Sequence, residues 1–473
     1  MNGSFFARHK KLLASFGVVA ALILLLWLIL RDVAPHLNQP LVPANTTPPH
    51  TGDDPPAMGM WPDHPEQDDS TLMLVAISGG GSRAAAVGWK ALEELRRIPY
   101  RFTNAQGQVV NSNLGNEIDL IAGISGGSFA ATAWCLGQDD TTFRRQFVER
   151  DIEGALAVNL LTAKGWLALF SRRYARINFA AELYDEEVFA RKKFADLPSR
   201  PLLRLHATNL ALGQRFTFTR ETFTRLGSDL NSYPLGYACA ASSAFPILLT
   251  PLTIENYGPA LDYSQDRNYI TKKDNSRGNL NEDLTVKAWD YYNDKENKYL
   301  HLADGGLVDN QGLQSILDEA VENTGLILKR INNTKSPLRR LIIVNLNAGV
   351  APPNASGRSP APPGVLSVVE STMVASMDVL SARRWMDIKE TCNQFNKTKI
   401  DSGDNSPYRL LEKPYAIEVS FRNILDPEKR KQAMELPTSF KLTSEQLKII
   451  DEVVPKLLEE DPELQRLKEA LAK

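Results

Sequence analysis

The chain has 473 residues, and its 54 lysines and arginines nearly balance 56 aspartates and glutamates, for a formal net charge of −2. No sustained basic stripe interrupts this balance, so the composition argues against a nucleic-acid partner. Three cysteines without metal-ligand spacing indicate neither a disulfide framework nor a zinc site, and no loop has the ordered oxygen ligands of a calcium site. We expect no metal and no cofactor.

The first predicted element is a membrane anchor. A nearly unbroken apolar run, Leu12 to Leu30, follows a basic tail over residues 1–11 and is about long enough to cross a bilayer as a helix. The positive-inside rule then predicts a single-pass anchor over residues 12–31, with the tail in the cytoplasm and the rest of the chain outside it, in the periplasm if the source is bacterial. A cleaved signal peptide is the alternative, but its apolar region is normally shorter and ends at a small-x-small site.

The anchor is followed by a segment of different composition. Residues 32–70 scatter prolines among Asn, Asp and Thr, a composition that cannot bury enough apolar surface to fold. Because proline holds the chain extended, we expect a spacer that tethers the remaining chain, residues 71–473, to the anchor.

A strand, glycine turn and helix open the large domain. The apolar strand 72–78 leads directly into Gly79, Gly80 and Gly81, and a helical pattern begins near Ala84. Successive glycines can turn several backbone N–H groups towards one point, which suits a phosphate or an oxyanion. A dinucleotide site would have glycine at 84, and a P-loop would have Gly-Lys-Ser/Thr, so neither fits. A plain tight turn remains the alternative.

The second such unit contains a serine. The predicted strand 118–122 and the predicted helix 128–134 flank Gly-Ile-Ser-Gly-Gly, which places Ser125 on a tight strand-to-helix turn. The small residues Gly123 and Gly127 allow strand and helix to approach closely while the hydroxyl projects into a site. The helix N-terminus behind Ser125, beginning with Gly126, has free N–H groups that favour a developing oxyanion.

The third piece, Asp304-Gly305-Gly306, supplies a carboxylate on a glycine turn. A triad hydrolase needs a histidine, and only His206 and His301 follow the glycine run. His206 lies within a predicted strand, where a structural role is favoured, and no histidine follows Asp304. Direct proton transfer from Ser125 to Asp304 is therefore the simpler hypothesis, with turn capping as the alternative role of Asp304.

The remaining elements complete the predicted architecture. Strand-like segments alternate with helical stretches, which predicts an α/β sandwich with a largely parallel sheet. The strands are expected at 72–78, 118–122, 202–208, 215–219, 341–347 and 415–421. We expect a lid or surface loop over 255–300, an exposed loop over 351–364, and helices over 366–395 and 443–472. Segment 155–170, with a basic end reaching Arg176, indicates an apolar helix that packs on the domain or rests on a membrane.

The ordered set GGGSR, GISGGS and DGGLVDNQG resembles the patatin-like phospholipase family over residues 72 to about 315. The resemblance implies a patatin-like three-layer sandwich in which Ser125 is the nucleophile and Asp304 the base. It also implies an oxyanion hole and a supporting set: Gly79, Gly80, Gly81 and Gly126 for the hole, and Arg83, Gly123, Gly127, Gly305 and Gly306 for support. Asn310 follows the loop that begins at Asp304, called here the acid loop, as it does in relatives. Ser78 and Ala84 replace the aspartate and the glycine that are usual in the family.

These observations together predict a membrane-anchored serine lipid acyl hydrolase, with residues 71–473 as the catalytic domain and its C-terminal helical extension. The expected partners are an acyl-ester membrane lipid and, through residues 12–31, the bilayer itself. A His-dependent esterase that uses His301, and a non-catalytic lipid-binding module, are the alternatives. The lipid headgroup, acyl position and protein partners are not encoded in these motifs.

Overall fold

The computed structural model describes residues 17–25, 38–41, 67–104, 106–160, 162, 171, 174–246, 248–259, 270, 273, 280–321, 326–331, 338–350, 364–401, 410 and 412–472.

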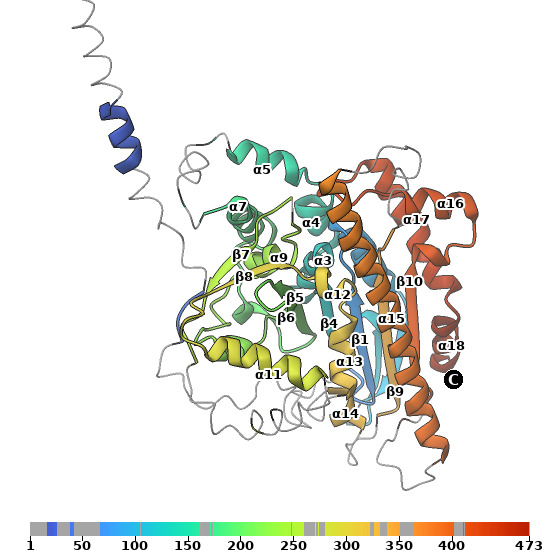
Figure 1. Cartoon of the computed structure of the whole chain (residues 1–473). Helices are drawn as coiled ribbons and strands as arrows, with labels where there is room; N and C mark the ends of the chain where they lie inside the picture. The colour runs from blue at the N-terminus through green and yellow to red at the C-terminus, as the bar shows by residue number, and fades with distance from the viewer. Residues whose placement is uncertain are drawn as a thin grey trace, which may run out of the picture.

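A mixed, mostly parallel sheet forms the centre of the described chain (Figure 1). Its order is β10-β9-β1-β4-β5-β8-β7, with β6 also paired to β5. The five strands from β10 to β5 run parallel, whereas β6, β7 and β8 join in antiparallel pairings. The strands are β1 (Thr71–Ile77), β4 (Ile118–Ile124), β5 (Leu202–Asn209), β6 (Gln214–Thr217), β7 (Leu252–Glu255), β8 (Tyr299–Asp304), β9 (Arg340–Asn347) and β10 (Tyr415–Ser420). A separate hairpin joins β2 (Pro99–Thr103) to β3 (Val109–Asn113).

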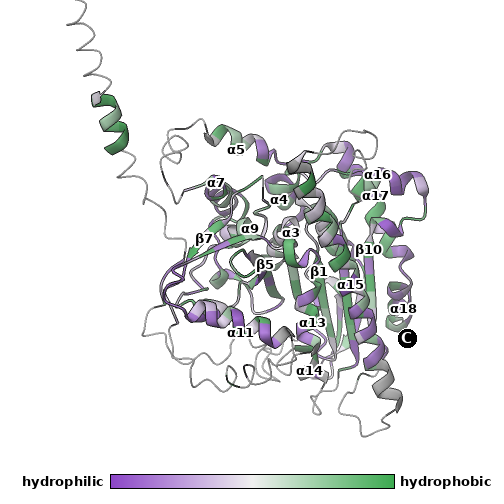
Figure 2. Cartoon of the chain, in the orientation of Figure 1, coloured by the Kyte–Doolittle hydropathy of each residue, from purple (hydrophilic) through white to green (hydrophobic). Residues whose placement is uncertain are grey.

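Helices cover both faces of this sheet, and alternate residues of β1 pack into two separate cores, one on each face. Met73, Val75 and Ile77 pack on the side of α2 (Gly81–Arg96), α3 (Gly126–Cys135) and α17 (Ser444–Glu460). Leu72, Leu74 and Ala76 pack on the side of α13 (Leu313–Val321), α14 (Leu326–Ile331) and α15 (Val365–Asp401). Figure 2 shows β1 as hydrophobic, whereas α11 at the surface is largely hydrophilic. The predicted α/β sandwich with a largely parallel sheet is confirmed.

Shorter helices complete the described chain. The α-helices are α4 (Asp140–Phe143), α5 (Ile152–Leu160), α7 (Arg176–Leu183), α8 (Arg220–Arg225), α9 (Leu235–Ser242), α11 (Leu280–Asn293), α12 (Gly306–Asp309), α16 (Pro427–Met434) and α18 (Pro462–Leu471). The 3-10 and π segments are η2 (Leu114–Glu117), η3 (Arg144–Val148), η4 (Tyr184–Val188), η5 (Phe194–Asp196) and η9 (Phe421–Asn423).

All six predicted strands are present within a few residues of their expected bounds. Two predictions outside the sheet core differ in part from the structure. The segment 255–300 contains helix α11, whose Val286, Trp289 and Tyr292 are buried, and then the first two residues of strand β8, so it is not simply a surface loop. The predicted C-terminal helix is broken at Asp461, which caps α18 through its carboxylate while Pro462 provides the first residue of that helix.

The apolar segment 155–170 is described only in part. Residues 163–170, Arg172 and Arg173 lie outside the described residues, and Arg176 begins a separate helix, α7. The predicted loop 351–364 also lies almost wholly outside them. Helix α15 confirms the helix predicted over 366–395 and extends beyond it at both ends.

The N-terminal predictions have two different outcomes. Of the predicted anchor, residues 17–25 form a helix with exposed side chains, and the rest of 12–31 lies outside the described residues. No described helix combines the length and apolar character needed to cross a bilayer. The structure therefore gives the predicted transmembrane helix no support.

The first described residues of the predicted spacer, 38–41, differ from the prediction. Asn38 is fully buried, and its side-chain Nδ2 donates to Ser228 Oγ at 3.1 Å and to the Glu255 carbonyl oxygen at 2.8 Å. Its Oδ1 accepts the N–H of Glu255 at 2.9 Å. Pro40 forms an antiparallel bridge with Ser228. Residues 38–41 are thus docked on the domain, because backbone and amide hydrogen bonds can fix a segment that has little apolar surface.

Candidate active site

Ser125 occupies a strained turn between β4 and α3. Its φ of 50° and ψ of −123° are unusual for a residue with a side chain. The close packing around it explains the two neighbouring glycines: a Cβ on Gly123 would lie 2.7 Å from Ser128 Cα, and one on Gly127 would lie 2.5 Å from the Ser78 carbonyl oxygen. The sequence-based interpretation of Gly123 and Gly127 as residues that permit close approach is confirmed.

Asp304 lies against this serine. Ser125 Oγ donates a hydrogen bond of 2.7 Å to Asp304 Oδ2, and the N–H of Gly306 donates one of 2.7 Å to Asp304 Oδ1. The carboxylate is only 3% exposed. Burial raises the pKa of Asp304 to about 6, although the hydrogen bonds from Gly306 and Ser125 oppose that rise. The group is therefore mainly ionised at neutral pH and can accept a proton.

The sheet brings these two residues together across 179 positions of sequence. Strand β4 ends at Ile124, which is in register with His206 of β5. The next residue of β5, Ala207, is in register with Asp304 at the end of antiparallel β8. The proximity of Ser125 and Asp304 thus results from the pairing of three adjacent strands, and no local sequence pattern reveals that pairing.

The glycine run forms the N-terminus of α2 and contacts the N-terminus of α3. A Cβ on Gly126 would lie 1.9 Å from the Gly81 carbonyl oxygen, so the two helix starts meet at that point. Among the hydrogen bonds of the described residues, none uses the N–H of Gly80, Gly81 or Gly126. The N–H of Gly79, in contrast, donates to the Asn310 carbonyl oxygen at 2.7 Å. The prediction of Gly79 as an oxyanion donor needs correction, because that N–H is already used.

The side chains of the two histidines that follow the glycine run bond residues other than Ser125. His206 is fully buried, with Thr217 Oγ1 3.1 Å from Nδ1 and Ser315 Oγ on Nε2. Burial, with Arg215 and Arg204 nearby, lowers the pKa of His206 well below its ordinary value, so the ring is neutral. His301 is exposed on β8 and its Nδ1 contacts Thr253 Oγ1 at 2.9 Å. The structural interpretation of His206 is confirmed.

The described chain also matches a known family. Residues 75–317, just over half of the chain, match the family model described as patatin-like phospholipase. The chain belongs to the patatin-like phospholipase family. The family membership predicted from its motifs is confirmed.

Solved structures similar to this patatin-like phospholipase include human GIVD cytosolic phospholipase A2, at 12% identity and a TM-score of 0.41, over 86% of this chain and 63% of that one. The same human enzyme in complex with methyl gamma-linolenyl fluorophosphonate gives 11% identity and a TM-score of 0.40, over 85% of this chain and 59% of that one. VipD from Legionella pneumophila gives 13% identity and a TM-score of 0.26, over 82% of this chain and 67% of that one. This chain thus spans less than two thirds of the human enzyme. No curated protein matches the chain.

Two buried side chains, Ser78 and Arg83, hold the glycine loop in place, and Ser78 departs from the usual family pattern. Ser78, in place of aspartate, accepts a 2.9 Å hydrogen bond from the Ala348 N–H through its hydroxyl and so still fixes the loop to the end of β9. Arg83 is 2% exposed and donates to the carbonyl oxygens of Ala348 at 2.9 Å and Leu436 at 2.7 Å. Burial lowers the pKa of Arg83 to about 10, which leaves it charged at neutral pH. Its role is to hold the loop in place.

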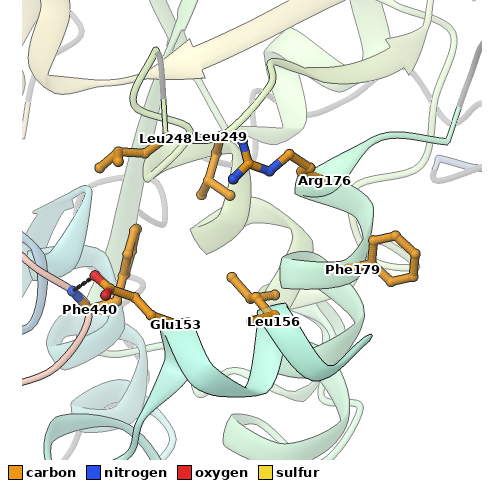
Figure 3. A pocket seen from close by; sticks show the side chains of 8 residues that line it. Glu153, Leu156, Arg176, Phe179, Leu248, Leu249 and Phe440 are labelled. Carbon is orange, nitrogen blue, oxygen red and sulfur yellow. Dashed lines mark hydrogen bonds between the residues drawn. The ribbon is translucent and has the colours of Figure 1, made fainter. Parts of the chain in front are cut away.

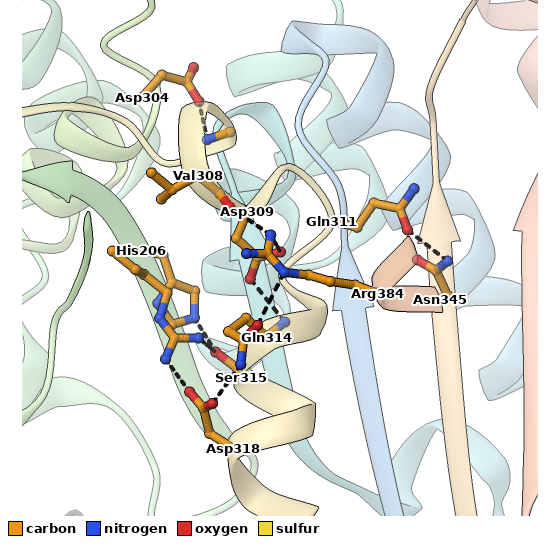
Figure 4. Close-up of polar contacts among 12 residues, drawn as sticks. His206, Asp304, Val308, Asp309, Gln311, Gln314, Ser315, Asp318, Asn345 and Arg384 are labelled. Carbon is orange, nitrogen blue, oxygen red and sulfur yellow. Dashed lines mark hydrogen bonds and ion pairs between the residues drawn. The ribbon is translucent and has the colours of Figure 1, made fainter. Parts of the chain in front are cut away.

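The acid loop of this patatin-like phospholipase is held by a residue outside the matched region (Figure 4). Arg384 of α15 donates to the Val308 carbonyl oxygen at 2.6 Å and to Gln314 Oε1 at 3.1 Å. It also pairs with Asp309 Oδ1 at 3.3 Å, and that carboxylate is almost completely buried. The C-terminal extension therefore reaches back to the helix, α12, that follows Asp304.

Sequence reasoning missed three further contacts. Ser242, at the end of α9, accepts the N–H of Ser125 at 2.9 Å. The Ser439 carbonyl oxygen accepts the N–H of Ser82 at 2.9 Å, and the Asn310 amide oxygen would lie 2.5 Å from a Cβ on Gly79. Asn310 was noted only for its place in the family pattern. Ser242 and Ser439 lie in segments without any motif, so no sequence signal marks them. The site is completed by distant small polar residues.

Proposed function

We propose that the chain hydrolyses acyl esters of membrane lipids, with Ser125 as nucleophile and Asp304 as general base. The observation that supports this most directly is the 2.7 Å hydrogen bond from Ser125 Oγ to Asp304 Oδ2, with both groups nearly buried. A nucleophile and a base within hydrogen-bond reach are the minimum that covalent acyl transfer needs. The position of His301, away on β8 and against Thr253, disfavours a His-dependent mechanism.

In the acylation step, Asp304 Oδ2 takes the proton of Ser125 while Oγ forms a bond to the ester carbonyl carbon. The carbonyl electron pair moves to its oxygen, and the resulting oxyanion needs preorganised donors. We assign that role to the N–H groups of Gly80, Gly81 and Gly126, because the N-termini of α2 and α3 meet there and have a partial positive charge. When the tetrahedral intermediate collapses, the C–O bond breaks and Asp304 gives its proton to the leaving alcohol.

Deacylation repeats these steps with water. Asp304 takes a proton from a water molecule, whose oxygen attacks the acyl group on Ser125. Collapse of the second intermediate returns the proton to Ser125 Oγ and releases a fatty acid. The N–H of Gly306 remains on Asp304 Oδ1 throughout and stabilises the carboxylate whenever it is charged.

The membrane is part of the proposal. The apolar run over residues 12–31, with its basic flank, supports a retained anchor that holds the domain outside the cytoplasm, beside its substrate. The docked residues 38–41 would then keep the domain close to that bilayer. A membrane lipid is the substrate class that fits both the family and the anchor.

The proposal is tested with a fluorophosphonate probe and with lipid ester hydrolysis by the full-length protein. Wild type should label at Ser125, and Ser125→Ala and Asp304→Asn should each remove nearly all turnover, with a double mutant hardly worse. Asp304→Asn should stay folded, because it removes a charge that burial disfavours. His301→Ala is the control and should keep most activity. Turnover by Ser125→Ala, or its loss in His301→Ala, would reject the dyad.

A further inference from the structure

The two faces of the sheet differ in what lies beside their aliphatic cores. On the side of α2 and α3, a cavity of about 320 Å³ lies between α5 and α7, and Leu249 and Phe440 are among its lining residues (Figure 3). None of the proposed catalytic residues lines this cavity. On the side of α15 there is instead a pair of buried amides, Gln311 and Asn345, which begins one residue after Asn310 (Figure 4).

Asn345 interrupts an aliphatic face of its strand. Strand β9 is buried along its whole length, and Leu341 and Ile343, which share the face of Asn345, belong to the core under α15. Asn345 is fully buried, and its Nδ2 donates to Gln311 Oε1 at 3.0 Å. Its Oδ1 has no hydrogen-bond partner among the described residues. An aliphatic side chain of the same shape would avoid the free-energy cost of that unpaired oxygen, which indicates that the amide has a role other than stability.

Both members of the pair connect to the loops that form the proposed site. Gln311 follows Asn310, which ends the acid loop and whose carbonyl oxygen accepts the N–H of Gly79 at 2.7 Å. Asn345 is in register with Ala76 of β1, three residues before Gly79. The hydrogen bond between the two amides therefore joins the end of the acid loop to the strands that lead into the glycine loop.

We infer that this hydrogen bond places the acid loop against the glycine loop, so that Gln311 and Asn345 are positioning residues for acyl transfer at Ser125. The inference rests on the proposed function for the reaction that the placement serves. The base and the oxyanion donors lie on these two loops, and a displacement of about 1 Å between reacting groups can lower a rate about a hundredfold. Asn345 lies outside the residues that match the family, and no motif marks it.

The first test separates positioning from stability. The double substitution Gln311→Met and Asn345→Leu keeps the shape of both side chains and leaves no unpaired polar atom in the pair. The full-length double variant should therefore unfold at a denaturant midpoint equal to or above that of wild type. Its kcat for p-nitrophenyl acetate should nevertheless fall by about tenfold, with KM changed by less than about twofold. A double variant with the kcat of wild type would overturn the inference.

The single variant Gln311→Met keeps the test decisive if the double variant folds poorly. It leaves the buried Asn345 amide without its partner, so both the denaturant midpoint and kcat should fall. A lower midpoint with the kcat of wild type would assign the pair a structural role only and would reject the positioning role.

Tyr100→Phe is the matched control, because it removes a buried hydrogen bond at the other end of the same sheet. The Tyr100 hydroxyl donates to Asp68 Oδ2 at 2.6 Å and lies 2.7 Å from Oγ1 of Thr71, the first residue of β1. Gly79, in contrast, follows the last residue of that strand. The control should lower the denaturant midpoint and keep kcat within about twofold of wild type. A tenfold loss of kcat in Tyr100→Phe would show that any lost buried hydrogen bond lowers activity, which would remove the support for positioning.

The last measurement does not require turnover. The Gly79 N–H donates to the Asn310 carbonyl oxygen, so its exchange with deuterium reports whether the two loops stay together. This amide should exchange at least about tenfold faster in the double variant than in wild type or Tyr100→Phe. Equal exchange in wild type and the double variant would overturn the inference. Faster exchange, together with no ester hydrolysis and no fluorophosphonate label in wild type, would support the placement of the loops and reject the proposed function.

Discussion

At the level of single residues, the ionisation of Asp304 controls the proposed chemistry. Burial raises its folded-state pKa to about 6, so the carboxylate that accepts the serine proton is present above that pH and lost below it. The kcat/KM for a short neutral ester should therefore be nearly flat above about pH 7 and fall towards about one tenth of its plateau at pH 5. A pH series from 4.5 to 8.5 measures this. The same acid limb should persist in His301→Ala, and a limb that disappears there would assign it to the histidine instead.

The glycine loop permits a second test at residue scale. Gly80 has a φ of 138°, which a residue with a side chain rarely adopts, and its added Cβ would lie 2.9 Å from Arg83 Nη2. Gly80→Ala should displace the loop and lower kcat by about a hundredfold, with a smaller change in KM, because oxyanion donors act in the transition state. Gly137→Ala is the control, since Gly137 also has a positive φ, 67°, but its Cβ would meet nothing within 4 Å. A loss confined to KM would indicate a substrate-binding role.

At the level of elements, α15 fixes the acid loop from outside the region that matches the family. Arg384→Gln should lower kcat by about tenfold to a hundredfold, because a small displacement of α12 moves Asp304 relative to Ser125. It should also lower the free energy of unfolding by about 3 kcal/mol, because the buried Asp309 loses its cation.

Arg383→Gln provides the control for this prediction, because the neighbouring Arg383 is exposed on the same helix. Kinetics are compared at a temperature well below the unfolding midpoint of each variant, which separates misplacement from unfolding. Equal kcat values for both variants would show that α15 does not position the acid loop.

At the level of the whole molecule, the docked N-terminal segment restricts how far the domain can lie from its proposed anchor. The seven residues from Arg31 to Asn38 span at most about 25 Å, much less than a free spacer ending at residue 70 could reach. Removal of residues 1–31 should leave a folded enzyme that keeps activity on short dispersed esters. It should lose much of its activity towards lipid in its own membrane, because the effective concentration of substrate falls.

Orientation is measured in the same experiment series. Protease added to intact cells or spheroplasts should digest the domain and spare the basic tail. Activity on membrane lipid that is unchanged by the deletion would argue against anchoring, and full protection of the domain until lysis would place it in the cytoplasm.

The sequence by itself determined the elements that depend on neighbouring residues. The strand before Gly79, the turn at Ser125 and six of the eight sheet strands follow from local apolar patterns and from the steric freedom of glycine, which act over a few residues. The family resemblance follows from the same short motifs. Ser125 and Asp304 could be chosen as a pair only because few histidines were available as alternatives.

Only the tertiary structure decided which distant groups meet. The antiparallel strand β8 delivers Asp304 to Ser125, Arg384 reaches the acid loop from a helix 75 positions beyond Asp309, and Asn310 uses the N–H of Gly79 that sequence reasoning assigned to the oxyanion. Asn38 docks a proline-rich segment that its composition predicts to be extended. These contacts depend on strand order and on packing between remote segments, and neither is recorded in the local spacing of residues.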